Sequence, residues 1–249
     1  MIFRQLFEPL SSTYTYVLGC ARTHQAVLID PVYPTWERDL AVLGELGLTL
    51  AYTLETHVHA DHITSALKLR EETGSRIVFP AQSAAQCPDL AVTEATPLVV
   101  GDLVLHPLYT PGHTDDHHCY LFRDRVMTGD ALLIDGCGRT DFQNGDADAL
   151  YSSIHGKLFT LPDDTLVMPG HDYHQRHVST ILQEKERNAR LGNQRGREDF
   201  KALMANLDLA YPKFIDYAVP GNRRCGVCPS YLPEDLADYC EQMTESPQG

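Results

Sequence analysis

Hydrophobic and polar residues alternate along the first 170 positions in a way that predicts short strands interleaved with helices. The apolar runs at 13–19 and 25–30 predict a hairpin, and "LAYTLETH" at 50–57 predicts the next strand. Between them, apolar residues at helical spacing over 35–47 predict an amphipathic helix that stops at Gly47.

The rest of the pattern completes the predicted architecture. A helix is expected over 61–74 and helical structure over 175–210, with an irregular Pro-rich tail from 211. Further strands are predicted at 76–79, 97–100, 103–108, 118–122, 125–129 and 165–170. Hairpins mixed with helices indicate an α/β layered fold in which two mixed sheets pack face to face between helices. We expect a single domain over 1–249, with a core over about 1–210 and an irregular extension over 211–249.

Composition and charge narrow the classes of partner. The 249 residues carry a formal net charge of −14, so we expect neither nucleic acid nor an anionic membrane as the main partner. The start, "MIFRQLFEPLSS", resembles neither a secretory signal nor a transit peptide, and no apolar run approaches the roughly 18 residues of a membrane span. Seven scattered cysteines do not suggest a disulfide framework. We therefore expect a protein of the reducing cytoplasm.

One short segment concentrates candidate chemistry. "THVHADH" at 56–62 contains His57, His59, Asp61 and His62. A core could not bury these side chains without partners, because desolvated polar groups are costly. His57 and His59 are two residues apart and point the same way in an extended segment. The cluster favours a metal site.

Three more segments have the same character, and each lies at a predicted strand end. "PGHTDDHH", "MTGDALL" and "MPGHDYH" supply His113, Asp130 and His171, each after a glycine that permits a tight turn. One isolated histidine is more often a core or surface residue than a ligand. Four such segments at strand ends predict a single metal centre. We interpret the other histidines, His117 and His118 among them, as ordinary core or surface residues.

The order THxHxDH, PGHT, TGDALL, PGH resembles the metallo-β-lactamase superfamily, which implies an αββα sandwich with metals at the strand ends. Within it, "GDALLIDGCGRTDFQNGD" (129–146), "GHDYH" (170–174) and "IDYAVPGNRRCGV" (215–227) resemble the glutathione persulfide dioxygenases, the family of the ethylmalonic encephalopathy protein. The resemblance implies a non-haem iron enzyme that oxidises glutathione persulfide with O2 and water to sulfite and glutathione.

The resemblance also implies a ligand set. His57, His113 and Asp130 would hold one Fe(II) per chain and leave coordination positions open for O2 and substrate. Four residues would either hydrogen-bond the ligands and water or hold a second metal ion: His59, Asp61, His62 and His171. Asp61 and Tyr173 are the side chains expected to take part in catalysis.

Residues for binding the tripeptide follow from the same resemblance. Arg139, Tyr173 and Arg190 match positions that grip glutathione, and a planar guanidinium pairs bidentately with a carboxylate. The alternative for Arg190 is a solvated helix face. His117 and His118 depart from the small or hydroxyl residues more usual after PGHT, which affects the expected wall of the site near His113.

Two other functions remain open at this point. One is a glyoxalase II-type hydroxyacylglutathione (thioester) hydrolase with a binuclear metal site. The other is a thiol or metal sensor built on Cys225, Cys228 and Cys240, which lack a clear fourth ligand. We interpret the C-x-x-C pair at 225 and 228 as structural or incidental. We expect a homo-oligomer (a dimer). We also expect any sulfurtransferase partner to be a separate protein, because 229–249 is too short for the rhodanese domain fused to some relatives.

Overall fold

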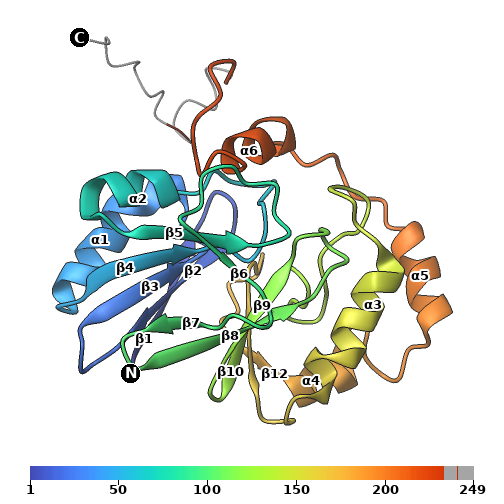
Figure 1. Cartoon of the computed structure of the whole chain (residues 1–249). Coiled ribbons are helices and arrows are strands. Elements are labelled where there is room, and N and C mark those ends of the chain that lie inside the picture. The colour runs from blue at the N-terminus through green and yellow to red at the C-terminus, as the bar shows by residue number, and fades with distance from the viewer. Residues whose placement is uncertain (233–239, 241–249) are drawn as a thin grey trace.

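The computed structural model describes residues 1–232 and Cys240 and forms two six-stranded sheets packed face to face (Figure 1). The first sheet has its strands in chain order: β1 (Ile2–Glu8), β2 (Thr13–Gly19), β3 (Gln25–Ile29), β4 (Thr49–Leu54), β5 (Arg76–Pro80) and β6 (Leu90–Val92). β1, β2 and β3 pair antiparallel, whereas β3, β4, β5 and β6 pair parallel.

The second sheet has the order β12-β11-β10-β9-β8-β7. Its strands are β7 (Leu98–Val100), β8 (Leu103–Tyr109), β9 (His118–Phe122), β10 (Arg125–Gly129), β11 (Leu166–Pro169) and β12 (Ser179–Thr180). β10 and β11 pair parallel and the other neighbours pair antiparallel. Both sheets are therefore mixed, as predicted.

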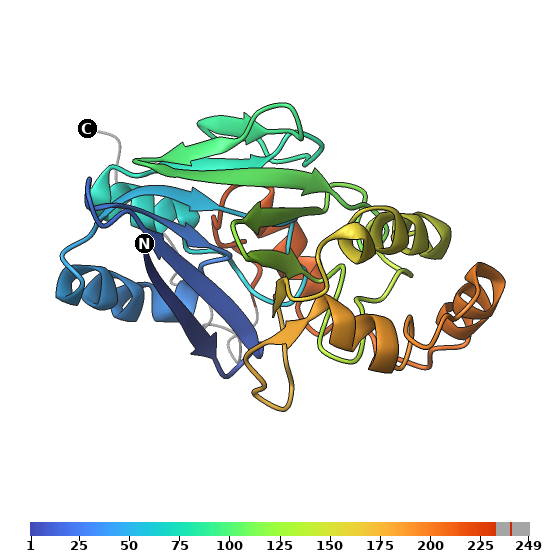
Figure 2. The same cartoon turned by 90° about the horizontal axis from the view of Figure 1, so that it is seen from below.

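Helices cover the two outer faces. They are α1 (Trp36–Glu45), α2 (Ala66–Thr73), α3 (Ala147–Gly156), α4 (Ile181–Arg187) and α5 (Arg197–Ala205), with 3-10 turns η1 (Tyr33–Thr35) and η2 (Leu158–Thr160). A sixth helix, α6 (Ile215–Asn222), lies at one end of the sandwich and packs against Ile63 (Figure 1). α1 and α2 lie outside the first sheet, and α3, α4 and α5 lie outside the second (Figures 1 and 2). The predicted αββα sandwich is confirmed. No helix in the part of the chain that the structure describes has the length and apolarity to span a bilayer.

The main core lies between the sheets. Tyr14, Tyr16 and Leu18 of β2 face the second sheet, while Val17 faces the helices, as the two-residue period of a strand requires. Tyr16 is fully buried, and its hydroxyl donates to the Pro169 carbonyl at 2.6 Å. This bond ties the two sheets together beside the last predicted ligand segment.

Three element predictions need correction. The helix expected over 61–74 begins at Ala66, because the preceding residues form an irregular loop held by contacts from elsewhere in the chain. The stretch 175–210 contains two short helices, α4 and α5, in place of continuous helix. The tail expected to be irregular contains α6, which includes Pro220 and packs Ala218 against Ile63.

The prediction that the cysteines form no disulfides is wrong. Cys87 is bonded to Cys225, and Cys228 to Cys240, while three cysteines are free: Cys20, Cys119 and Cys137. Folding brings the Cα atoms of Cys87 and Cys225 to 6.0 Å, within the roughly 4.4–6.8 Å that a disulfide spans. Cys225 and Cys228 therefore bond to two different partners and do not bond to each other.

Candidate metal centre

Four strand ends deliver the predicted ligand residues to one end of the sandwich. β4 of the first sheet leads into His57. In the second sheet, β8, β10 and β11 lead into His113, Asp130 and His171. Residues contributed by both sheets thus converge where the sheets meet.

His57, His113 and Asp130 form a compact group. Each offers one ligand atom, and these atoms lie within 4.8 Å of one another. Nε2 of His113 is 3.6 Å from Oδ2 of Asp130. Two imidazoles and one carboxylate at this spacing fit a divalent metal ion with open coordination positions.

Hydrogen bonds hold both imidazoles in the tautomer that a metal needs. Nδ1–H of His113 donates to the Arg139 carbonyl at 2.8 Å. Thr56 donates its hydroxyl proton to Asp30, so its oxygen accepts from Nδ1–H of His57 at 2.9 Å. Burial, reinforced by neighbouring imidazoles, lowers the pKa of His57 well below its ordinary value. In both rings Nδ1 is therefore occupied by a hydrogen bond and Nε2 is free, the arrangement typical of metal-bound histidines.

Asp130 is supported by a residue that the sequence interpretation missed. His117 is fully buried, and its Nε2 accepts from the Asp130 backbone N–H at 3.1 Å. Gly129, which precedes Asp130, has φ +46°, and a Cβ there would lie 2.6 Å from His117 Nε2 and 2.8 Å from Thr56 Oγ1. Interpreting His117 as an ordinary core residue was incomplete, because it fixes the turn that presents the carboxylate. Its departure from the family pattern was the available signal.

His171 bridges two carboxylates. Its Nδ1 is 2.6 Å from Oδ1 of Asp130, and its Nε2 is 2.7 Å from Oδ2 of Asp61. Burial alone would lower the pKa of His171, but the two carboxylates outweigh it and raise the pKa well above its ordinary value. Both ring nitrogens thus face a carboxylate oxygen, so a metal ion at His171 would have to replace one of these two contacts.

His59 and His62 form a second group with Asp61, whose ligand atoms also lie within 4.8 Å of one another. Nε2 of His59 lies 3.0 Å from Oδ1 of Asp30 and 3.3 Å from Oε2 of Glu55. Nδ1 of His59 and Nε2 of His62 are buried with no hydrogen-bond partner among the described residues. With this geometry, His59, Asp61 and His62 could either hydrogen-bond the ligands and water or hold a second metal ion.

A cleft of about 410 Å³ adjoins the metal group and is within the roughly 300–1,000 Å³ usual for small-ligand pockets. Arg139, Tyr173 and Arg190 all line it, together with Asp61 and His113. The structure thus brings the predicted substrate residues and the predicted ligands to one cavity.

These three side chains differ in their present partners. The Arg139 guanidinium pairs bidentately with Asp141 at 2.6 and 2.7 Å. Arg190 donates to the Cys137 carbonyl at 2.5 Å and has no carboxylate partner within residues 1–232. It lies in the turn after α4 and lines the cleft, so the alternative of a solvated helix face does not hold. Tyr173 is 75% exposed at the rim, with its ring 6.4 Å from that of His171.

Sequence reasoning missed other residues at this site. Lys213 lines the cleft next to α6 and has no carboxylate partner in the described part of the chain. Asp30 follows β3 and accepts from both the backbone N–H and the hydroxyl of Thr56. Asn222 comes from the tail and bonds to the backbone of the first histidine segment. A carboxylate directly after a buried strand was a signal for Asp30, whereas Lys213 and Asn222 had none.

Comparison with known proteins places these features in context. The model of the metallo-β-lactamase superfamily matches residues 9–171. Persulfide dioxygenase ETHE1, mitochondrial, of Homo sapiens is 47% identical over 230 residues, covering 91% of this chain and 89% of that protein. The crystal structure of ETHE1 from Myxococcus xanthus superposes with a TM-score of 0.89 at 54% identity, covering 91% of this chain and all of that one. Hydroxyacylglutathione hydrolase of Rhodospirillum rubrum is 34% identical over 237 residues, covering 93% and 87%.

Proposed function

This chain belongs to the metallo-β-lactamase superfamily, and we propose that it is a persulfide dioxygenase that oxidises glutathione persulfide with O2 and water to sulfite and glutathione. The outer sulfur atom of the persulfide loses four electrons, which reduce one molecule of O2. Water supplies the third oxygen atom of sulfite, and the reaction releases two protons. The enzyme is therefore an oxidoreductase.

The observation that carries the proposal is the group of His57, His113 and Asp130 beside an open cleft. A ferrous ion held there would supply the redox chemistry that joins O2 to sulfur. The lowered pKa of His57 and the depressed pKa of Asp130, which burial opposes and His171 enforces, suit a divalent cation. We propose one iron per chain.

The remaining residues of the cleft bind and orient the substrate. Arg139, Arg190 and Lys213 line one cavity of a chain whose formal net charge is −14, which makes the cleft locally suited to the two carboxylates of glutathione. Tyr173 lies at the rim, where its ring can cover the bound tripeptide. Asp61 shares a proton with His171, which in turn fixes Oδ1 of Asp130 and leaves Oδ2 facing His113.

The alternative is a glyoxalase II-type hydrolase with two metal ions, and the group of His59, Asp61 and His62 is the observation that favours it. The test is to supply the metal-loaded protein with glutathione persulfide and, separately, with a hydroxyacylglutathione thioester. We expect sulfite in proportion to O2 consumed from the persulfide and little thioester hydrolysis. Fast thioester hydrolysis without O2 uptake would reject the dioxygenase.

Three predictions about the wider setting remain. A homodimer and a separate sulfurtransferase that supplies the persulfide are proposed from the family resemblance. A cytoplasmic location also stays a prediction, and the name of the human relative assigns that protein to mitochondria. The division into a core over 1–210 and an extension from 211 is retained as a proposal, with α6 now part of that extension.

A further inference from the structure

Asn222 ends α6 and contacts the first histidine segment from outside the region that the superfamily model matches. Its side chain is buried, and its Nδ2 donates to the His59 carbonyl at 2.9 Å and to the His62 carbonyl at 2.8 Å. Its Oδ1 accepts from the Thr64 backbone N–H at 2.9 Å. One amide thus holds both ends of the loop over 59–64.

This loop depends on such support. Residues 55–65 lie between β4 and α2, and their one regular pairing is an isolated bridge from Thr64 to Val32. Buried backbone carbonyls without a partner carry a desolvation penalty comparable to a lost hydrogen bond. Without the Asn222 amide, two carbonyls and one N–H of the loop would lose their partner.

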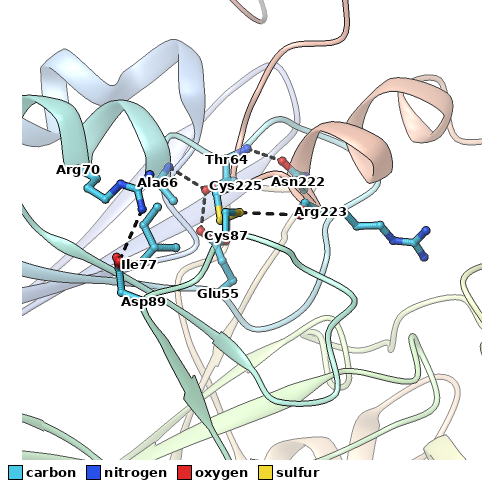
Figure 3. Close-up of a disulfide and its surroundings, with 10 residues drawn as sticks. All are labelled: Glu55, Thr64, Ala66, Arg70, Ile77, Cys87, Asp89, Asn222, Arg223 and Cys225. Carbon is cyan, nitrogen blue, oxygen red and sulfur yellow. Dashed lines mark hydrogen bonds and ion pairs between the residues drawn. A yellow bond between two sulfur atoms is a disulfide. The ribbon is translucent and has the colours of Figure 1, made fainter.

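The chain around Asn222 is itself fixed in place. The Cys225 carbonyl accepts from the Leu67 N–H at 3.0 Å at the start of α2. Cys225 is also bonded to Cys87 (Figure 3). Gly226 has φ +98°, and a Cβ there would collide with the Thr64 carbonyl. Figure 3 shows Asn222 and Thr64 joined beside this disulfide.

Two routes lead from the loop to the proposed ligands. The His59 ring packs against the His57 ring with centroids 4.2 Å apart. Asp61, in the middle of the loop, holds His171, which holds Asp130. A shift of the loop backbone would therefore move the surroundings of two of the three ligands.

We propose that Asn222 is a positioning residue for the metal centre: its amide sets the backbone of the 59–64 loop and thereby the geometry in which His57 and Asp130 bind metal. The inference rests on the proposed function in one respect: the identity of the metal as iron comes from it. Asn222 does not itself line the cleft, whereas Ala60 and Asp61 of the loop that it holds do. Its amide therefore acts on the site through the loop and does not contact a bound substrate.

The test measures Fe(II) affinity anaerobically by competition with a colorimetric chelator. Asn222→Asp keeps the size and the acceptor for Thr64 but loses both donors, and Asn222→Ala loses all three bonds. Because partners outside the ligand set typically contribute about 10–100-fold in metal affinity, we expect a loss of that size in both variants. At saturating iron, the KM for glutathione persulfide should change far less than the Fe(II) affinity, within about twofold, because the side chains proposed to bind the tripeptide, Arg139, Arg190 and Lys213, belong to other segments of the chain.

Asn188 provides a matched control. It is also a buried asparagine that clamps a loop, with Nδ2 donating to the Gly136 carbonyl at 2.9 Å and Oδ1 accepting from the Leu191 N–H at 3.1 Å. Asn188→Ala should lower the melting temperature and leave the Fe(II) affinity unchanged. If both Asn222 variants bind Fe(II) within twofold of the wild type, the proposal is overturned.

A measurement on the wild type covers the case in which the variants do not fold. Coupling between two sites is reciprocal, so Fe(II) binding should slow hydrogen exchange of the Thr64 amide by about 10–100-fold. Exchange that Fe(II) leaves unchanged would overturn the proposal. Variants that lose iron in a protein whose wild type consumes no O2 with glutathione persulfide would support the positioning role and reject the proposed function.

Discussion

Removing the Cys87–Cys225 disulfide should destabilise the protein substantially, because it closes a long loop. The two residues are 138 positions apart, and the chain-entropy model gives about 5 kcal/mol for a loop of that length. Measured values are typically about 2–4 kcal/mol. At about 2–4 °C per kcal/mol for a chain of this size, Cys87→Ser/Cys225→Ser should unfold about 4–16 °C below the wild type.

The assay is thermal unfolding followed by circular dichroism, with and without a thiol reductant. Cys228→Ser/Cys240→Ser is the control: its cysteines are 12 positions apart, so the same model gives about 2 kcal/mol less. The reductant should lower the melting temperature of the wild type. In Cys87→Ser/Cys225→Ser it can break only the Cys228–Cys240 disulfide, so the further decrease should be small. Thiol titration of the unreduced, denatured wild type should find three of the seven thiols. Seven titratable thiols, or a first variant that melts with the wild type, would refute the pairing.

Three further predictions follow from other sites. Burial raises the pKa of Asp39 from 3.8 to about 6, so its contribution to stability is greatest below pH 4 and is lost as the pH rises to about 6. Asp39→Asn should therefore be more stable than the wild type at pH 7.5 by up to about 3 kcal/mol, with little gain at pH 4, in urea titrations; equal gains at both pH values would contradict this. Arg190→Ala should lower kcat/KM for glutathione persulfide by roughly 10–150-fold, the equivalent of about 1.5–3 kcal/mol, with iron content unchanged. Arg197→Ala, which removes an exposed ion pair with Asp148, is its control and should leave kcat/KM alone. His57→Ala should lose more iron than His59→Ala by metal analysis, and equal loss would favour a binuclear site.

Local patterns predicted the parts of the fold that local forces determine. The strands at 13–19 and 25–30 and the helix near 35–47 match β2, β3 and α1 closely, because their apolar residues face continuous cores. The helix predicted from residue 61 failed for a physical reason. The loop before Ala66 bonds to Asn222, and no local pattern reports a partner about 160 residues away.

In the site, too, features that depend on local sequence could be predicted, and features that depend on contacts between distant segments could not. Ligand-type residues that follow glycine at strand ends could be found from the sequence, and the structure brings His57, His113 and Asp130 together. The pairing of Cys87 with Cys225 and the support of Asp130 by His117 depend on contacts between different elements. Spacing along the chain carries no information about either.

The most direct test of the account is iron stoichiometry measured together with O2 uptake. Protein loaded with Fe(II) under anaerobic conditions and freed of excess metal should retain one iron per chain and consume O2 when glutathione persulfide is added. Asp130→Asn should fold normally but lose most of the iron and the O2 uptake with it, since a neutral amide is a poorer ligand for a divalent ion. Two metal ions per chain, no O2 uptake and hydrolysis of a glutathione thioester would contradict the account.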